Sequence, residues 1–248
     1  MTTNITMTNK IKNANKNLSW NIICDFDGTI SLADVTDSLL VQFATAEWKQ
    51  FEQIWQDGLI GSRQCLAQQI PLLDMSLSEL NEHLDQIQID PDFPAFVTEI
   101  QKKGHKLTVV SDGLDYSIKR ILKRCGLNSL DIKANKLVQT GERSWGINFY
   151  HTDPNCKILS GNCKCSVVKK SQPANTKHDQ FLLIGDGASD FCVANEVDFV
   201  FAKNGLIKHC LKEKIPFEPI ENFAQVLSLF SSQNLTNRLS IDSRNSSD

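Results

Sequence analysis

Residues 22 to 29 read Ile-Ile-Cys-Asp-Phe-Asp-Gly-Thr, an apolar run that ends in two carboxylates. The apolar residues predict a buried strand, and Gly28 predicts a turn directly after it. Successive side chains of a strand point to opposite faces, so Asp25 and Asp27 share one side where the strand ends. One carboxylate can attack a substrate while the other handles a proton, and both lie close to any cation bound there.

Apolar runs alternate with helical patterns along the rest of the chain. Four runs predict buried parallel strands: Trp20–Phe26, Lys106–Ser111, Phe181–Gly185 and Val197–Ala202. Helical patterns occupy Pro94–Lys103, Asp115–Cys125, Ala188–Glu196, Gly205–Lys214 and Glu221–Phe230. Two shorter strands are expected at Leu130–Gln139 and Gly146–His151, around a turn at Gly141. This order predicts an α/β fold with a doubly wound, Rossmann-like parallel sheet, in which ligands bind beyond the carboxyl ends of the strands.

A long insertion separates the first two strands. Asp27 and Ser111 are 84 positions apart, whereas a simple βαβ unit takes roughly 30 residues. The intervening residues predict three helices: Thr36–Gln56, Ser62–Leu73, and one that opens with a Ser76–Glu79 capping box and runs to about Ile87. We therefore expect a core made of residues 20–32 and 89–230, with a helical cap inserted at residues 33–88. Such a cap would exclude water from the strand ends, although helices that only cover the sheet would give the same pattern.

The composition and net charge limit which kinds of binding partner the sequence predicts. Hydrophobic residues make up 41% of the chain and charged residues 22%, which is ordinary for a globular protein. The net charge of −3 gives no electrostatic reason to expect nucleic acid or an anionic membrane as a partner. Residues 1–19 lack the apolar core of a secretory signal, and both they and residues 231–248 are expected to be disordered. With 8 cysteines and no secretory signal, a reduced, cytoplasmic protein is expected.

Polar motifs follow two other predicted strands. The first, Val-Val-Ser-Asp-Gly at 109–113, offers the Ser111 hydroxyl and free backbone N–H groups near Gly113, which can hold phosphoryl oxygens. The second, Ile-Gly-Asp-Gly-Ala-Ser-Asp at 184–190, places Asp186 and Asp190 around a turn that opens a helix. Asp190 could hold a cation or could simply cap that helix.

A lysine lies between these two motifs, in Gly-Asn-Cys-Lys-Cys-Ser-Val-Val at 161–168. A lysine is a compact point charge suited to a phosphate and to a carboxylate nucleophile. A turn precedes Lys164 and a helical run follows it, which favours Lys164 over its neighbours Lys157, Lys169 and Lys170.

Together, in this order, the four motifs resemble those of the haloacid dehalogenase (HAD) superfamily of phosphatases, over residues 20 to about 205. The compact helical insertion resembles the phosphoserine-phosphatase-like branch. The resemblance implies that Asp25 is the nucleophile of a phospho-aspartyl intermediate and that Asp27 is the general acid and base. It also implies phosphate contacts from Ser111, Gly113 and Lys164. A Mg²⁺ ion would be held by the Asp25 carboxylate, the Asp27 backbone carbonyl, Asp186 and, as ligand or support, Asp190.

Some details of the motifs narrow the resemblance further. A motif lysine flanked by cysteines, Ser-Asp-Gly in the second motif and the ending Gly-Asp-Gly-Ala-Ser-Asp-Phe-Cys resemble two groups of the superfamily. One group acts on hydroxy-keto-methylthiopentenyl phosphate in methionine salvage, and the other on phosphocholine and phosphoethanolamine. Asp112 replaces the Gly usual in phosphoserine phosphatases, which makes serine phosphate a poorer candidate. Arg63, at the start of a predicted cap helix, is expected to bind an anionic group of the substrate, or else to face solvent.

Several alternatives stay open at this point. A small-molecule phosphate ester is the expected substrate, but a phosphotransferase or mutase differs only in what attacks the intermediate. A non-hydrolytic phospho-acceptor module also uses an aspartyl phosphate and a lysine on an α/β sheet. The second acid, Asp27, favours turnover over storage. Cys156, Cys163 and Cys165 could bind zinc, with His151 as a fourth ligand, or could be reduced loop thiols.

Overall fold

A computed structural model of the protein describes residues 19–171 and 180–231. The segments expected to be disordered, 1–19 and 231–248, fall outside this range except for Ser19 and Ser231.

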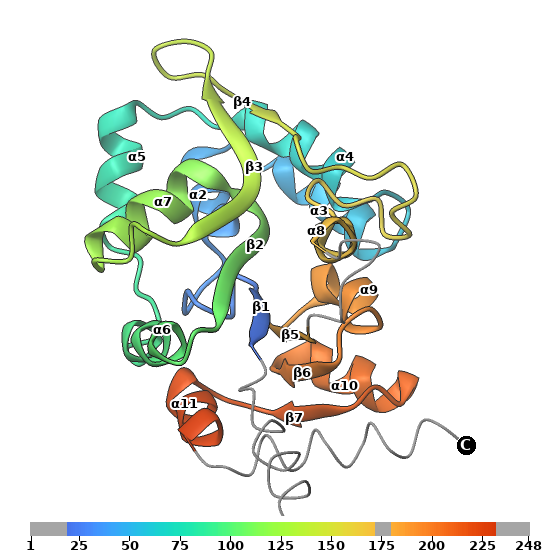
Figure 1. Ribbon diagram of the computed structural model, residues 1–248. Coiled ribbons are helices and arrows are strands. Elements are labelled where there is room, and N and C mark those ends of the chain that lie inside the picture. Colours follow the sequence, from blue (N-terminus) through green and yellow to red (C-terminus); the bar gives the residue numbers. More distant parts are fainter. Residues whose placement is uncertain (1–18, 172–179, 232–248) are drawn as a thin grey trace, which may run out of the picture.

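A seven-stranded sheet forms the centre of the molecule, in the order β4-β3-β2-β1-β5-β6-β7 (Figure 1). The strands are β1 (Trp20–Cys24), β2 (Lys106–Leu114), β3 (Asp131–Gln139), β4 (Trp145–Asn148), β5 (Gln180–Gly185), β6 (Phe199–Ala202) and β7 (Phe217–Pro219). All neighbouring pairs are parallel except β3 and β4, which are antiparallel. These two are the short strands expected around the Gly141 turn, with β4 ending at Asn148 and not at His151. The predicted α/β fold is therefore confirmed.

Helices cover both faces of the sheet, as a continuous apolar strand requires. Within β1, Ile22 and Cys24 pack into one hydrophobic cluster and Ile23 packs into another on the opposite face. The first cluster includes side chains from α6 (Phe93–Lys102), α7 (Asp115–Arg124) and α11 (Phe223–Ser231). The second includes side chains from α8 (Lys164–Lys170), α9 (Phe191–Ala194) and α10 (Asn204–Glu213). Figure 1 shows these two groups on opposite sides of β1.

The strand order places a crevice at the carboxyl end of β1. The chain passes from β1 to β2 on one side and later returns to β5 on the other, and ligands bind at such a switch point. β2 does not end at Ser111 as predicted; it continues to Leu114, and its pairing with β3 shifts register between Val110 and Leu114. Ser111, Asp112 and Gly113 lie in this irregular stretch, which projects past the last β1–β2 pair, Cys24 with Val109.

Residues 33–88, called here the helical segment 33–88, contain α2 (Val35–Phe43), α3 (Trp48–Gln56), α4 (Ser62–Gln69), a 3₁₀ turn η1 (Ile70–Leu72) and α5 (Leu77–Leu84). The prediction of one helix over Thr36–Gln56 was wrong. Ala44 is extended and pairs with Leu73 in an isolated bridge, so the chain leaves the helix between α2 and α3. The capping box of Ser76 and Glu79 is present.

The second of the predicted helices in this segment is shorter than expected, because the turn at Ile70–Leu72 takes the 3₁₀ form with Pro71 inside it. Likewise, the helix predicted at Ala188–Glu196 is a 3₁₀ turn η2 (Ala188–Asp190) followed by the short α9. No helix in the described part of the chain is both long and apolar enough to cross a membrane.

Candidate active site

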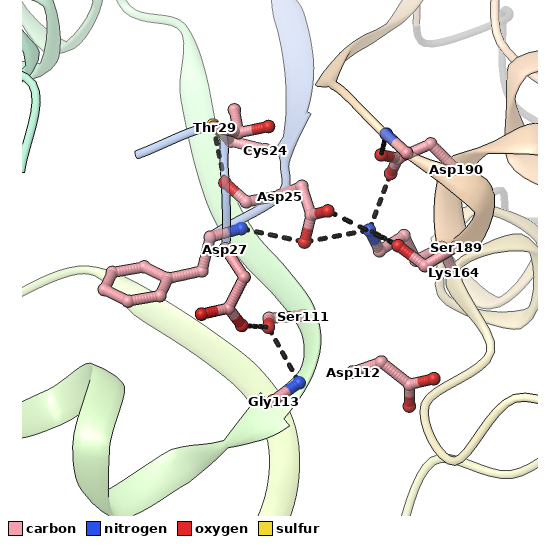
Figure 2. A network of polar contacts seen from close by, with 12 residues as sticks. Cys24, Asp25, Asp27, Thr29, Ser111, Asp112, Gly113, Lys164, Ser189 and Asp190 are labelled. Carbon is pink, nitrogen blue, oxygen red and sulfur yellow. Dashed lines mark hydrogen bonds and ion pairs between the residues drawn. The ribbon is translucent and has the colours of Figure 1, made fainter. Parts of the chain in front are cut away.

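Asp25 lies directly after β1 and is buried with 5% of its surface exposed. Its Oδ1 accepts a hydrogen bond from the backbone N–H of Phe26 at 2.8 Å and lies 2.9 Å from Lys164 Nζ. Its Oδ2 accepts a bond from the Ser189 hydroxyl at 3.3 Å. Figure 2 shows the contacts with Lys164 and Ser189 on one side of the Asp25 carboxylate. The contacts hold the carboxylate in one orientation at the carboxyl end of β1.

Asp27 faces the opposite wall of the site. Its Oδ1 accepts a bond from Val35 N at 2.9 Å, at the start of α2, and its Oδ2 accepts one from the Ser111 hydroxyl at 3.3 Å. The Ser111 Oγ in turn accepts a bond from Gly113 N at 2.9 Å (Figure 2). A Cβ atom at Gly113 would lie 2.5 Å from the Asp27 carboxylate, so this close approach requires glycine.

Lys164 begins α8 and is almost fully buried, with 1% of its surface exposed. Its Nζ lies 2.6 Å from Asp190 Oδ1 and 2.9 Å from Asp25 Oδ1, and donates to the Ser189 hydroxyl at 2.9 Å. The three rival lysines are exposed: Lys169 pairs with Glu196, Lys170 follows it in α8, and Lys157 lines the cavity described below.

Asp186 and Asp190 follow β5 and form a third side of the site, beside Asp25 and Lys164. Asp186 Oδ1 accepts a bond from the Thr29 hydroxyl at 3.2 Å. The other oxygen of Asp190 accepts bonds from the backbone N–H groups of Asp186 at 3.0 Å and Gly187 at 3.3 Å. Asp190 therefore ties the loop that carries Asp186 to Lys164.

Gly28 forms the turn that lets the loop after β1 lie against Asp186. It has a positive φ of 71°, and a Cβ atom there would lie 2.6 Å from Asp186 Oδ2. Only glycine adopts this conformation without strain and leaves room for the carboxylate.

Burial gives these carboxyl groups unusual proton affinities. It raises the pKa of Asp25 well above the usual value; the charge of Asp190 adds to the shift and Lys164 opposes it. Burial, with a contribution from Asp34, raises the pKa of Asp27 to about 8. Burial alone would lower the pKa of Lys164, but the charges of Asp190 and Asp25 outweigh it and raise that pKa. The site thus concentrates more negative charge than Lys164 balances.

A divalent cation fits this excess of negative charge. Among the described residues, Asp25, Asp186 and Asp190 form the group of acidic side chains able to hold a metal, with ligand atoms within 4.8 Å of one another. An all-oxygen set of this kind suits Mg²⁺. A cation there would stabilise the ionised form of Asp25, which nucleophilic attack requires.

A cavity of about 720 Å³ opens above these residues. Its floor includes Asp25, Asp27, Ser111 and Asp186. Its walls come from the helical segment 33–88, from the loop before α8 and from the start of α9. They include Glu52, Trp55, Ser62, Leu66, Ile158, Leu159 and Phe191. The volume suits a metabolite larger than inorganic phosphate.

Comparison with known proteins now identifies the family. The model of a family described as Putative Phosphatase matches residues 21–241. The chain belongs to this family. Pdp3-interacting factor 1 of Schizosaccharomyces pombe is 30% identical over 215 residues, covering 83% of this chain and 92% of that protein. The 2-hydroxy-3-keto-5-methylthiopentenyl-1-phosphate phosphatase of Exiguobacterium sp. is 28% identical over 220 residues, covering 88% of this chain and all of that protein, 100%.

Solved structures agree on the fold of this Putative Phosphatase family member. A phospho-aspartyl intermediate analogue of phosphoserine phosphatase superposes with a TM-score of 0.64 at 21% identity, covering 85% of this chain and 97% of that one. A HAD family hydrolase from Salmonella enterica superposes with a TM-score of 0.66 at 18% identity, covering 88% and 73%. The chain is thus a member of the Putative Phosphatase family with the fold of HAD phosphatases, as the four motifs predicted.

Two groups that the sequence offered as candidates, Arg63 and the cysteine cluster, do not lie in this site. Arg63 is exposed and does not line the cavity of this family member; its guanidinium lies over the Phe149 ring, 5.7 Å from the centroid. The structure also does not gather Cys156, Cys163, Cys165 and His151 into a metal site within the described residues. Instead the Cys156 thiol contacts Ser160 Oγ at 3.2 Å, and Cys165 Sγ lies 2.9 Å from Cys192 Sγ, both as free thiols.

The structure adds residues that the motifs did not single out. Ser189 links Asp25 to Lys164, and Thr29 and Asn204 donate to Asp186 at 3.2 and 3.3 Å. Thr29 lies in the 22–29 motif and Ser189 in the 184–190 motif, so their positions in the sequence already indicated that they lie near the site. Asn204 follows β6, and the rule that ligands gather at carboxyl strand ends could have indicated it.

Proposed function

We propose that this HAD-type phosphatase hydrolyses a small phosphate monoester through a phospho-aspartyl intermediate on Asp25. The observation that supports this most directly is the placement of Asp25 between the Lys164 ammonium, at 2.9 Å, and the wall formed by Asp27 and Ser111. A phosphoryl group in line with Asp25 would meet a nucleophile, a cationic group and hydroxyl and N–H donors together.

Asp27 supplies the proton chemistry. With a pKa of about 8 it carries its proton at neutral pH and can donate it to the leaving oxygen as the ester bond breaks. The resulting carboxylate then accepts a proton from the water that attacks the aspartyl phosphate. This second step releases the phosphoryl group, whereas a regulatory module would keep it on the aspartate. In a phosphotransferase, an alcohol would attack the aspartyl phosphate in place of water.

We propose Mg²⁺ as the metal, which the carboxylates of Asp25 and Asp186 and the backbone carbonyl of Asp27 would hold. Asp190 lies within the same group but is 0% exposed and, unlike Asp25 and Asp186, does not line the cavity. Its contribution is to hold Asp186 and Lys164 in place. When bound, the ion supplies charge that offsets the repulsion between a phosphate and these carboxylates.

The first candidate substrate comes from the relatives. Several proteins similar to this chain are named 2-hydroxy-3-keto-5-methylthiopentenyl-1-phosphate phosphatase. The apolar side chains Trp55, Leu66 and Phe191 on the cavity wall could pack against the thioether end of that ester.

A specific observation favours a second candidate, a phosphate ester with a cationic amine such as phosphoethanolamine or phosphocholine. Three acidic residues of the helical segment 33–88, Asp34, Asp37 and Glu52, line the cavity, and Lys157 is the only lysine or arginine among the described lining residues. Burial together with Asp34 and Glu52 raises the pKa of Asp37 to about 7, so a cation there would relieve repulsion. Trp55 on the same wall could face a quaternary ammonium. We also propose that the helical segment 33–88 is a cap that covers this end of the substrate.

Phosphate release from a panel of esters tests the proposal. The panel contains the methylthiopentenyl phosphate, phosphoethanolamine, phosphocholine, phosphoserine and p-nitrophenyl phosphate, each with Mg²⁺ and with EDTA. Asp25→Asn should lose several orders of magnitude in kcat while keeping the fold, since an amide does not attack phosphorus. Activity above about a tenth of wild type in this variant would place the nucleophile elsewhere.

The panel also ranks the two substrate classes. A preference for the methylthiopentenyl ester supports the first candidate, and a preference for the amine esters supports the second. Adding an alcohol acceptor to the same assay separates hydrolysis from transfer, because a transferase would form a new ester in place of free phosphate.

A further inference from the structure

Asp112 stands next to Ser111 but takes no part in the contacts of the proposed chemistry. In Figure 2 its carboxylate points away from Asp27 and Ser111. Three segments far apart in the sequence donate to it: the Ser62 hydroxyl to Oδ2, and Asn162 N at 2.7 Å and Asn135 Nδ2 at 3.0 Å to Oδ1. A half-buried carboxylate with three donors from three elements acts as a junction between them.

One arm of this junction is the helical segment 33–88. Ser62 is the first residue of α4, and the start of that helix also rests on the loop before α8. Arg63 N donates to Leu159 O at 3.3 Å, and a Cβ atom at Gly61 would lie 2.3 Å from the same carbonyl. The first turn of α4 is therefore seated against Ile158 and Leu159, which line the cavity.

The second arm leads to Lys164. Asn162 precedes it by two residues and is buried, with 1% of its surface exposed. Its backbone N–H bonds to Asp112, and its Nδ2 donates to Ser111 O at 2.8 Å and Lys133 O at 2.5 Å. These bonds place the start of α8, and hence the lysine whose Nζ lies 2.9 Å from Asp25.

We propose that Asp112 is a positioning residue that joins the seating of α4 over the cavity to the placement of Lys164 beside Asp25. The inference rests on the proposed function. When α4 is seated, Ser62 completes the set of donors on Asp112, and Asn162 and the following lysine are held for phosphoryl transfer. Without the Asp112 carboxylate, the backbone N–H of Asn162 loses its partner, and the Asn135 side-chain amide keeps only the Asp112 backbone carbonyl. Lys164, two residues after Asn162, then loses its fixed position.

Four variants and one control test this role: Asp112→Ala, Asp112→Asn, Ser62→Ala, the double variant of Ser62→Ala with Asp112→Ala, and Ser78→Ala. Ser78 is exposed on α5, and its hydroxyl donates to the exposed Glu82 at 3.0 Å, so its variant should behave as wild type. Steady-state kinetics use p-nitrophenyl phosphate and the best ester of the panel, with thermal unfolding of each variant as a check on the fold.

Asp112→Ala should lower kcat about ten- to a hundredfold on both substrates, the range for a lost hydrogen bond to a charged group. Asp112→Asn keeps one acceptor oxygen and should recover part of that loss. Ser62→Ala should mainly raise KM for the ester whose leaving group contacts the cavity wall. The double variant should be no worse than Asp112→Ala alone, because Ser62 acts through Asp112.

Hydrogen exchange gives a readout that does not depend on turnover. The backbone amide of Asn162 should exchange faster in Asp112→Ala, and α4 should exchange faster in the same variant and in Ser62→Ala. If wild type releases no phosphate from any ester, the proposed function fails, while the exchange result still judges the junction.

Three results would overturn the role of Asp112. A raised KM with unchanged kcat in Asp112→Ala would make it a substrate ligand. Additive effects of Ser62→Ala and Asp112→Ala would separate α4 from Lys164. Unchanged exchange at Asn162 would show that its amide does not depend on Asp112. If Asp112→Ala fails to fold, Asp112→Asn and Ser62→Ala are compared by the same three criteria.

Discussion

Replacement of Lys164 by methionine, which has a similar length and no charge, should destabilise the protein strongly. Lys164 Nζ lies 2.6 Å from Asp190 and 2.9 Å from Asp25, and the Lys164 and Asp190 side chains are both 0% exposed. Removing one partner of a buried ion pair leaves an uncompensated charge and costs about 3–5 kcal/mol. With a urea slope of about 2–3 kcal/mol per M, the unfolding midpoint should fall by about 1–2.5 M.

The loss of stability should depend on pH and on Mg²⁺. Without the lysine, the folded state raises the carboxyl pKa values further above the ordinary value of 3.8. The folded protein then binds more protons than the unfolded chain, so its free energy of unfolding falls as pH rises between the ordinary and the raised pKa. The gap to wild type should therefore widen on going from about pH 5 to pH 8, and millimolar Mg²⁺ should close part of it by binding the folded state.

Urea unfolding in EDTA at pH 5 and pH 8, repeated with Mg²⁺, measures these effects. Lys169→Met is the matched control, because Lys169 lies in the same helix and pairs with Glu196 on the surface at 3.2 Å. Exposed pairs contribute little, so this variant should unfold close to wild type. A Lys164→Met loss no larger than that of Lys169→Met, or one that does not change with pH, would refute the assignment of Lys164 as the balancing charge.

Four further outcomes are expected. Asp27→Asn should slow an alkyl phosphate far more than p-nitrophenyl phosphate, whose leaving group needs little protonation, and equal defects would remove Asp27 from the acid role. Since Asp27 donates a proton only below its pKa of about 8, kcat/KM for an alkyl phosphate should decline as pH rises through that value; a profile still climbing at pH 9 would contradict it. EDTA should abolish activity, Mg²⁺ should restore it and Ca²⁺ should inhibit, because its looser coordination misplaces the attacking oxygen; full turnover in chelated protein would argue against the metal site. Arg63→Ala should leave KM within about twofold of wild type, because the Arg63 guanidinium lies over Phe149 and not in the cavity. A rise in KM of about tenfold or more, the effect of losing a charged hydrogen bond, would show that Arg63 reaches the substrate.

The sequence by itself determined the strands of the sheet and the motifs that follow them. A buried parallel strand needs an unbroken apolar run, as in Ile22–Cys24, and the turn after it needs a residue such as Gly28 that accepts a positive φ. These requirements are local, so they are visible in a short window of sequence. The parallel order then brings Asp25, Ser111 and Asp186 to one edge, because the carboxyl ends of parallel strands meet there.

Tertiary structure decided what depends on contacts between distant segments. The break between α2 and α3 follows from the pairing of Ala44 with Leu73, which overrides the helical pattern. Arg63 had a suitable charge and position in the sequence, yet its helix turns it toward Phe149. No local pattern indicated that Ser62 would reach Asp112, since 50 positions separate them.

Among the candidate lysines, Lys164 is the one buried between two carboxylates, while Lys169 and Lys170, on the same helix, are exposed. The charge is the same in all three, and the difference lies in desolvation, which strengthens each electrostatic contact and exists only once the surrounding side chains exclude water. The proton affinities of Asp25 and Asp27 have the same origin, since burial is the largest cause of both shifts. Sequence therefore supplied the chemical groups at the strand ends, and packing set their charges and their distances.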